Sequence, residues 1–186
     1  MEKVNQRVAV SKYLLKEGLL RLLKKKHISR ISVSELCQEA GINRTTFYRH
    51  YTAPRDVLQE FAMDQVREFA DQTVDGQNMQ DVREFVLRLC AFLYARVDMV
   101  RMFIQNDTEM DFMGIFQTLS QDFLGARTIL YRGRTMDEDT LRLTNTFFYS
   151  GMSALIRLWL TEDMDKTPEE IADLITGAFS RDVVLR

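Results

Sequence analysis

Six side chains that could contact a nucleic acid fall within seven consecutive positions, 44 to 50. An arginine can meet a guanine edge or a phosphate, and a threonine offers a hydroxyl to a base or phosphate and a methyl group to thymine. Tyrosine and histidine can donate to the phosphate backbone. The candidates for these contacts are Arg44, Thr45, Thr46, Tyr48, Arg49 and His50. Phe47, in their midst, is expected to be core, and Tyr51, four residues further on, is expected to point inward with it.

Two short helices are predicted to position these residues, one on either side of Gly41. Ser32 and Glu35 form an S-x-x-E capping box, in which the Ser32 hydroxyl accepts from the amide of residue 35 and the Glu35 side chain reaches back to the amide of residue 32. Gly41 suits the left-handed position after a helix end. Asn43 is expected to cap the second helix.

The start of the first short helix has a second possible use. Amides at a helix start favour a phosphate, so Ser32 and Ser34 are also candidates for contact with the nucleic-acid backbone. Two short helices with a glycine in the turn, following a longer helix, match the helix-turn-helix pattern, whose second helix lies in the major groove. A structural alternative is a plain amphipathic pair, which is common in helical proteins.

Charge is divided by region although the net charge is only −2. Residues 1–51 hold 11 Lys or Arg against 4 Asp or Glu, a balance of +7, whereas residues 52–186 hold 14 against 23, a balance of −9. A basic head on an acidic body favours a polyanion such as double-stranded DNA. For the run KKK at 24–26 taken alone, a solvated helix end is the favoured explanation.

The remaining chain predicts an all-α protein, since apolar residues recur at spacings of three and four and strand-like alternation is scarce. A first helix is expected over residues 4–26, with Val8, Leu15, Leu19 and Leu22 on one stripe. A helix from Pro54 to about residue 74 is followed by a loop, DGQN, at 75–78. Further helices are expected at about 79–97, 98–106, 110–131, 138–161 and 168–181, which makes about nine in all.

The composition and motifs of the chain limit its expected cellular location and the reactions it could catalyse. No window reaches the roughly 18 apolar residues that span a bilayer, and the amino terminus lacks signal-peptide features, so we expect a cytoplasmic protein with no membrane partner. Cys37 and Cys90 are expected to be reduced thiols in packing positions, with a redox sensor as the minority interpretation. No catalytic Ser/His/Asp pattern, metal-ligand spacing or phosphate loop appears, so we expect no enzyme activity, no metal and no cofactor.

The segment SVSELCQEAGINRTTFYRHY, residues 32–51, resembles the DNA-binding signature of the TetR family of transcriptional regulators. The similarity covers about residues 6–62. It implies a three-helix DNA-binding head, residues 1–53, and a helical domain, residues 54–186, that binds an effector and dimerises. Family members touch DNA at the positions of Ser32, Arg44, Thr45, Thr46 and Tyr48.

One position departs from the family pattern. Where members usually carry a phosphate-contacting lysine at the start of the fourth helix, this chain has Pro54 followed by Arg55. Either Arg55 substitutes for the lysine or the contact is missing. The segment GMSALIRLWLTEDMDKTPEEIADLI also resembles the end of a subset of the family, in which these residues form the last two helices.

The resemblance implies repression of nearby genes until a small effector, apolar or amphipathic, arrives. The aromatic and methionine residues after position 75 favour an adaptable pocket, although at helical spacing they also fit plain core. The lining candidates are Phe92, Phe103, Phe112, Phe116 and Phe148. Residues 147–160 are apolar on more than one face, which predicts a homodimer suited to a palindromic operator. The alternative is that they form a single buried central helix. The alternatives are a protein partner in place of the small molecule, and activation in place of repression.

Overall fold

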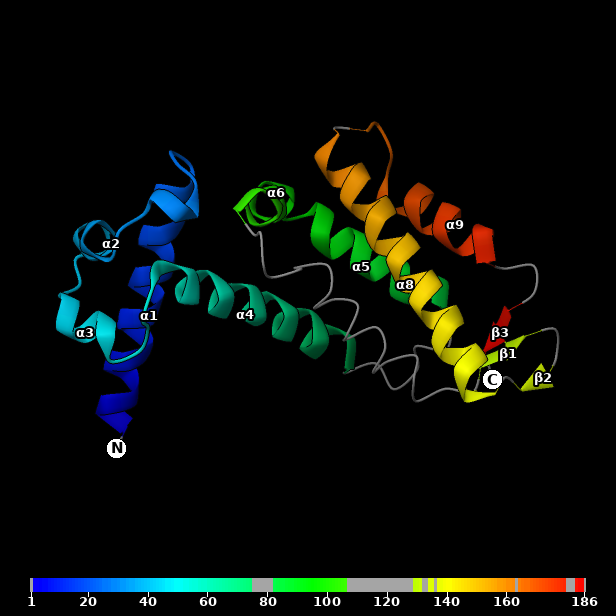
Figure 1. The fold of residues 1–186 in the computed structure, drawn as a ribbon, viewed down its shortest axis with the longest axis horizontal. Coiled ribbons are helices and arrows are strands. Elements are labelled where there is room, and N and C mark those ends of the chain that lie inside the picture. The colour runs from blue at the N-terminus through cyan, green and yellow to red at the C-terminus, as the bar shows by residue number, and fades with distance from the viewer. Residues whose placement is uncertain are drawn as a thin grey trace. The chain divides into compact units, whose positions relative to one another are not determined.

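The computed structural model describes residues 2–74, 82–106, 129–131, 134–135, 137–162, 164–179 and 183–185 (Figure 1). These residues are mostly helical, and the predicted all-α class is confirmed. The helices are α1 (Glu2–Leu23), a 3₁₀ turn (Ile28–Arg30), α2 (Val33–Ala40), α3 (Arg44–Tyr48), α4 (Pro54–Val74), α5 (Val82–Tyr94), α6 (Val97–Asn106), α8 (Glu138–Thr161) and α9 (Pro168–Phe179). Three short strands are β1 (Ile129–Tyr131), β2 (Arg134–Thr135) and β3 (Val183–Leu185).

The strands were not predicted, and the helix expected over 110–131 is wrong for its last three residues. β1 pairs antiparallel with β2 and with β3, so the sheet order is β2-β1-β3. Ile129 lies opposite Leu185 across more than 50 residues of sequence, a pairing that local spacing does not encode. Residues 110–128, and the loop expected at 75–78, lie outside the described residues.

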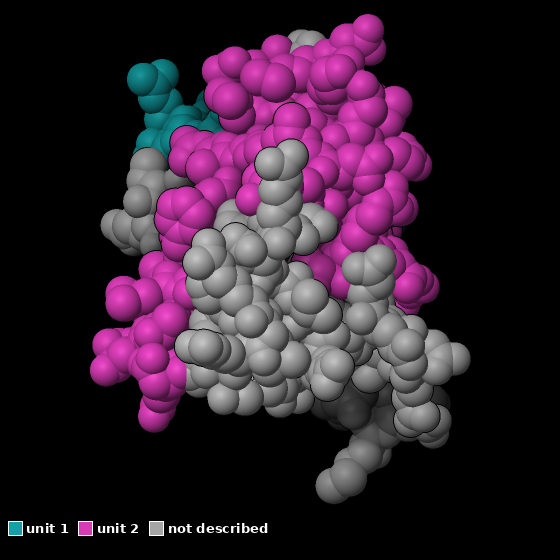
Figure 2. Space-filling model, turned by 90° about the vertical axis from the view of Figure 1, so that its right-hand side faces the viewer, with its two compact units in different colours: residues 1–65, 102–110 teal, residues 66–101, 111–186 magenta. Residues whose placement is uncertain are grey.

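The chain divides into two compact units (Figure 2). The first comprises residues 1–65 and 102–110, and the second comprises residues 66–101 and 111–186. The helices α4 and α6 each contribute residues to both. The first unit therefore includes more than the three helices of the expected head: it holds the first half of α4 and the carboxy-terminal half of α6.

The core of the first unit forms where α1 crosses α2. Leu15, Leu19 and Leu22 are buried as predicted, and they share this core with Leu36 of α2. Gly18 permits the close approach, because a Cβ at this position would lie 3.1 Å from the Cβ of Ala40. The helices α1 and α2 can therefore pack with a short distance between their backbones. This packing fixes the position of α2, the helix that leads into α3.

A buried polar contact ties α6 into the same unit. Asn106, 5% exposed, accepts from the amide of Ile28 at 2.8 Å and donates to the carbonyl of Met102 at 2.9 Å. Nearby in sequence, Phe103 is buried with its ring centroid 5.5 Å from that of Phe61 on α4. The end of α6 is thus held by one hydrogen bond and one ring contact.

The second unit is built on α5, α8 and α9. Phe69 of α4 packs its ring against Phe85 and Phe92 of α5, at centroid distances of 5.9 and 5.3 Å. At the end of α5, Tyr94 stacks on Trp159 of α8. The helices α8 and α9 each begin at a residue whose side chain caps the helix. The Asp137 side chain accepts from the amide of Thr140, and Thr167 and Glu170 form a reciprocal capping box before α9.

Candidate nucleic-acid interface

The turn between α2 and α3 has the geometry that its sequence predicts. Gly41 adopts φ 65° and ψ 28°, in the left-handed region. The Ile42 amide donates to the Cys37 carbonyl at 2.9 Å and the Gly41 amide donates to Gln38 at 3.3 Å, the two bonds of a Schellman motif. A glycine is favoured here because a Cβ in this backbone conformation is strained.

The five residues of α3 are capped and anchored from one side. The Asn43 side chain accepts from the Thr46 amide at 2.7 Å, which confirms the predicted cap. Phe47 is 0% exposed and Tyr51, just beyond the helix, is 4% exposed. Both point inward as predicted, so the opposite face of α3 is turned to solvent.

That outer face carries the polar side chains singled out in the sequence. Arg44, Thr45, Tyr48 and Arg49 are exposed, whereas Thr46 and His50 are half-buried. The Arg44 guanidinium lies 5.9 Å from the Tyr48 ring centroid, and its Nη2 is 3.5 Å from the Tyr48 hydroxyl. Arginine and tyrosine are four residues apart, so they lie one turn apart on the same face.

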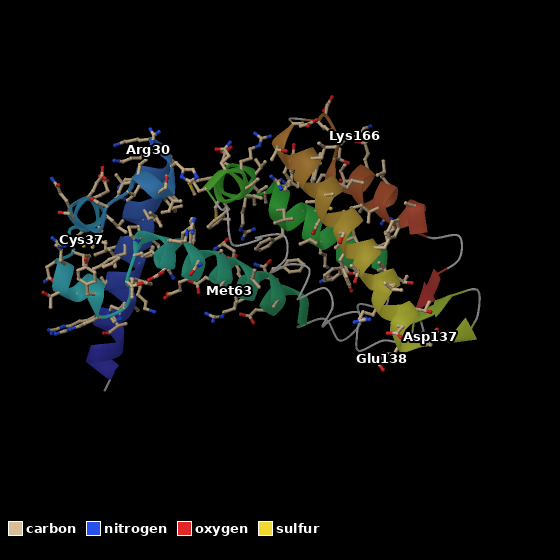
Figure 3. The ribbon with its side chains drawn as sticks, viewed as in Figure 1. Arg30, Cys37, Met63, Asp137, Glu138 and Lys166 are labelled. Carbon is tan, nitrogen blue, oxygen red and sulfur yellow. The ribbon has the colours of Figure 1, made fainter. Side chains whose placement is uncertain are left out.

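The three flanking candidates, Ser32, Ser34 and Arg55, lie at helix starts. Ser32 and Ser34 are exposed at the beginning of α2, and the Ser32 hydroxyl accepts from the Glu35 amide at 3.2 Å. Arg30, just before them, is exposed at the end of the 3₁₀ turn (Figure 3). Arg55 is half-buried in the first turn of α4.

The second half of the predicted capping box is wrong. The Glu35 carboxylate accepts from Lys26 Nζ rather than from the Ser32 amide. The Glu35 carboxylate is charged in either bond, but the Lys26 ammonium carries an opposite full charge and so attracts it more strongly than a neutral amide does. Lys26 belongs to the run KKK, so one of these three lysines is used in folding.

A carboxylate fixes the turn from α3 into α4. Asp56 accepts from the amides of Thr52 and Ala53, at 2.6 and 3.0 Å, and from the Thr52 hydroxyl at 2.6 Å. Partial burial opposes ionisation of Asp56, but these hydrogen bonds outweigh it and lower its pKa. The chain therefore enters α4 at Pro54 through a turn with three bonds to one side chain.

A second carboxylate joins three elements of the first unit. Glu60 of α4 accepts from Lys12 at 2.8 Å and Lys16 at 2.9 Å, both on α1, and from the Tyr51 hydroxyl at 3.1 Å. Lys16 also pairs with Asp64. We call these five residues the Glu60 network. Sequence analysis missed it because its members lie up to 52 positions apart, between Lys12 and Asp64.

The network shifts the pKa values of its members. Partial burial opposes ionisation of Glu60, but hydrogen bonds from Lys12 and Lys16 outweigh that cost and lower its pKa to about 2. Burial, and then the charge of Glu60, raise the pKa of Tyr51. The Tyr51 hydroxyl therefore stays protonated and donates to Glu60.

Ion pairing leaves only part of the basic head available to a polyanion. Lys12, Lys16, Arg21 and Lys26 are all engaged by carboxylates. Arg44 and Arg49, in contrast, are exposed, and no carboxylate in the described part of the chain forms an ion pair with either. The free positive charge thus includes the two arginines on and beside α3.

The proposed pocket residues are distributed over both units. Phe92 and Phe148 belong to the second unit, where Phe92 is buried and Phe148 is half-buried beside the ring of Tyr149. Phe103 is buried in the first unit. Phe112 and Phe116 lie outside the described residues. The Arg96 guanidinium carbon lies 3.9 Å from the Phe92 ring centroid.

Comparison with known proteins decides the family. The TetR family model described as "Transcriptional regulator C-terminal region" matches residues 80–181, more than half of the chain. The chain belongs to the TetR family of transcriptional regulators. A comparison with curated proteins gives no match.

Solved structures of three transcriptional regulators share the fold. A TetR transcriptional regulator from Streptococcus agalactiae 2603V is 19% identical with a TM-score of 0.71, and the match covers 95% of this chain and 97% of that one. NalD, the secondary repressor of the MexAB-OprM multidrug efflux pump in Pseudomonas aeruginosa, is 17% identical with a TM-score of 0.64, covering 94% and 96%. The dihydroxyacetone kinase operon activator DhaS is 15% identical with a TM-score of 0.61, covering 91% and 94%.

Three further observations concern the residues that the structure describes. None of their helices is long and apolar enough to cross a membrane. Among them, no group of three or more His, Cys, Asp or Glu side chains is arranged to hold a metal ion. Cys37, on α2 (Figure 3), and Cys90 are buried free thiols, and burial raises the pKa of each.

The pKa of Glu60 predicts how the stability of this TetR regulator depends on pH. The carboxylate contributes stability that is fully present above its ordinary pKa of about 4.3 and is lost as the pH falls toward 2. Between pH 5 and pH 3 the wild type should lose about 1 to 2 kcal/mol more than Glu60→Gln, because the amide has no proton to gain.

The measurement is urea unfolding at a fixed protein concentration at each pH. Glu17→Gln, a half-buried position on α1 outside the network, is the matched control and should keep the wild-type pH dependence. Equal pH dependence in the wild type and Glu60→Gln would contradict the low pKa of Glu60.

Proposed function

We propose that this TetR regulator is a cytoplasmic, ligand-responsive repressor that binds a palindromic operator as a homodimer. The observation that carries the DNA-binding part is the two-sided character of α3. Phe47 and Tyr51 anchor it from within, while Arg44 and Tyr48 lie exposed on its outer face. A helix held in this way can enter the major groove without losing its packing.

The roles of the contacting residues follow from their chemistry. Arg44, in the first turn of α3, is placed to read a guanine, since the first residues of a recognition helix meet base edges. Thr45 and Thr46 supply hydroxyl and methyl contacts in the same turn. We assign Tyr48, at the end of α3, and Arg49 and His50, just beyond it, to phosphates. A second group at the starts of α2 and α4 is assigned the same role: Ser32, Ser34 and Arg55.

We predict that a selection from random duplexes returns an enriched, roughly palindromic site, and that its affinity falls steeply with salt, because each neutralised phosphate releases counterions. Arg44→Ala should lose about 1 to 3 kcal/mol on this site and much of its base preference. Tyr48→Phe should weaken all duplexes alike, because a phosphate contact carries no sequence information. Fluorescence anisotropy on selected and scrambled duplexes measures both effects.

Gln6→Ala, at an exposed position of α1 outside the proposed contacts, is the control for this experiment. A selection that enriches no site would refute sequence-specific binding. A reversed pattern, in which Tyr48→Phe alters base preference and Arg44→Ala does not, would exchange the two roles.

Dimerisation is proposed from an apolar surface on α8 and α9. Leu143, Phe147 and Leu158 of α8 are 67%, 72% and 46% exposed, and Leu174 of α9 is 56% exposed. The three α8 positions are spaced by 4 and 11 residues, so they lie on one face of the helix. Exposed apolar residues concentrated in this way mark an interaction site, and a two-fold axis lets one patch cover its own copy.

We predict that Phe147→Arg shifts the protein from dimer toward monomer, because it places a charge in the centre of the proposed apolar interface. Val10→Arg, at an exposed apolar position of α1 outside this surface, should leave the oligomeric state unchanged. Sedimentation equilibrium over a range of concentrations distinguishes the two variants. A wild-type monomer, or a Phe147→Arg dimer as stable as the wild type, would contradict the proposal.

The effector is proposed to act through helices that belong to both units. A small apolar or amphipathic ligand in the helical body would displace α4, which follows the recognition helix directly. We propose α6 as a second connection; the contacts of Asn106 with Ile28 and of Phe103 with Phe61 support this. We retain Phe92, Phe103, Phe112, Phe116 and Phe148 as the proposed lining.

We predict reciprocal coupling, in which a ligand that lowers operator affinity binds more weakly to the operator complex by the same factor. Couplings of this kind are about 1 to 3 kcal/mol, and linkage requires them to be symmetric. Apolar and amphipathic compounds would be screened by thermal shift, and a bound compound titrated calorimetrically with and without operator duplex. Equal ligand affinity in the two titrations would contradict ligand control of DNA binding.

A second candidate function is activation, or control by a protein partner. Val10, Tyr13 and Leu14 are 57%, 62% and 36% exposed on α1, an apolar surface within the unit that carries α3. A regulator that recruits another protein needs such a surface near its DNA site. A reporter gene behind the selected operator distinguishes activation from repression, since expression rises with an activator and falls with a repressor.

A further inference from the structure

We propose that Glu60 is a positioning residue for the recognition helix. Its carboxylate holds Tyr51 at a fixed place relative to α1 and α4, and it thereby sets the orientation in which α3 meets DNA. This inference rests on the proposed DNA binding by α3. It assigns a role to a side chain that is itself no candidate for DNA contact.

Both oxygens of Glu60 are used. Oε2 accepts from Lys12 Nζ at 2.8 Å and from the Tyr51 hydroxyl at 3.1 Å, while Oε1 accepts from Lys16 Nζ at 2.9 Å. The Glu60 side chain is only 27% exposed, so water screens these bonds less than at an open surface. Hydrogen bonds to a charged group contribute more than neutral ones. The carboxylate is therefore held from two directions.

Tyr51 connects this carboxylate to α3. Its amide donates to the Phe47 carbonyl at 3.0 Å, so Tyr51 belongs to the turn that ends the recognition helix. Its ring packs 5.7 Å from that of Phe47, and Lys12 Nζ lies 5.6 Å from its ring centroid. A shift of the Tyr51 hydroxyl relative to Glu60 is thus transmitted to Phe47, the buried anchor of α3.

The network also places α1 and α4 in one frame. Lys12 and Lys16 are one turn apart on α1, and Glu60 and Asp64 are one turn apart on α4, so the two pairs face each other along the crossing. Any movement of α4 relative to α1 has to stretch these bonds and the bond to Tyr51 together. Glu60 is therefore a point at which a displacement of α4 reaches the recognition helix, in addition to the turn that Asp56 holds.

Two substitutions test this role. Tyr51→Phe removes the hydroxyl and leaves the buried ring, whereas Glu60→Gln removes the charge and leaves the shape. Each should weaken binding to the selected operator about tenfold, the loss expected for one hydrogen bond to a charged group. Affinity for a scrambled duplex should change less, because non-specific binding depends on charge rather than on the orientation of α3.

Controls separate positioning from stability. Tyr13→Phe removes an exposed hydroxyl from α1, and Glu39→Gln breaks the ion pair with Arg21 between α1 and α2. Both variants should keep operator affinity within about twofold, since an exposed hydroxyl or a single surface ion pair contributes little free energy. Dissociation constants are measured by anisotropy well below the unfolding temperature of each variant. The double variant Tyr51→Phe with Glu60→Gln should lose no more operator affinity than the weaker-binding single variant. Both substitutions act on the same contact, the hydrogen bond between Tyr51 and Glu60, so their effects should not add.

The outcomes separate this inference from the proposed function. If the wild type selects no duplex, the proposed function fails and the inference with it. If the wild type binds its operator and Tyr51→Phe binds equally well, the inference alone is overturned. The same holds if specific and scrambled duplexes weaken in parallel, or if the losses in the double variant add. Should Glu60→Gln fail to fold, Tyr51→Phe decides the question.

Discussion

The recognition helix has five residues, and a helix this short does not form in water by itself. Its existence and its direction therefore depend on contacts outside it. Asn43 supplies the cap, Phe47 supplies the buried anchor, and Tyr51 ties the end of the helix to Glu60. In the proposed mechanism, the bond from Tyr51 to a charged acceptor on α4 is a contact through which a displacement of α4 would alter DNA recognition.

The dependence of α3 on contacts outside it also explains how charge is distributed in the head. Lysines of α1 that appear in the sequence as positive charge for a polyanion are largely neutralised by Glu60 and Asp64. These acids follow the basic segment in sequence but belong to the same compact unit. Arg44 and Arg49, the arginines that we propose contact DNA, remain exposed. The charges of Lys12 and Lys16 are instead paired with carboxylates where α1 packs on α4.

Local features of the site could be predicted from sequence because they depend on neighbours along the chain. The Gly41 turn, the Asn43 cap and the inward Phe47 each follow from a few adjacent residues. The Glu60 network could not be predicted, since it requires knowing that α1 and α4 cross at matching turns. The predicted bond from the Ser32 amide to Glu35 was wrong for a related reason. A capping box describes local geometry and takes no account of a competing ammonium, which here is that of Lys26. The β1–β3 pairing depends on a partner near the end of the chain.

The central claim is that α3 reads DNA from a position set by its buried anchors. The most direct measurement is a crystal structure of the protein bound to its selected operator. We expect α3 in the major groove, Arg44 on a base edge, and the bond from Tyr51 to Glu60 intact. In a dimer, the two copies of α3 should be about 34 to 36 Å apart, or a multiple of that distance. A complex in which α3 lies outside the groove, or in which another element contacts the bases, would contradict it.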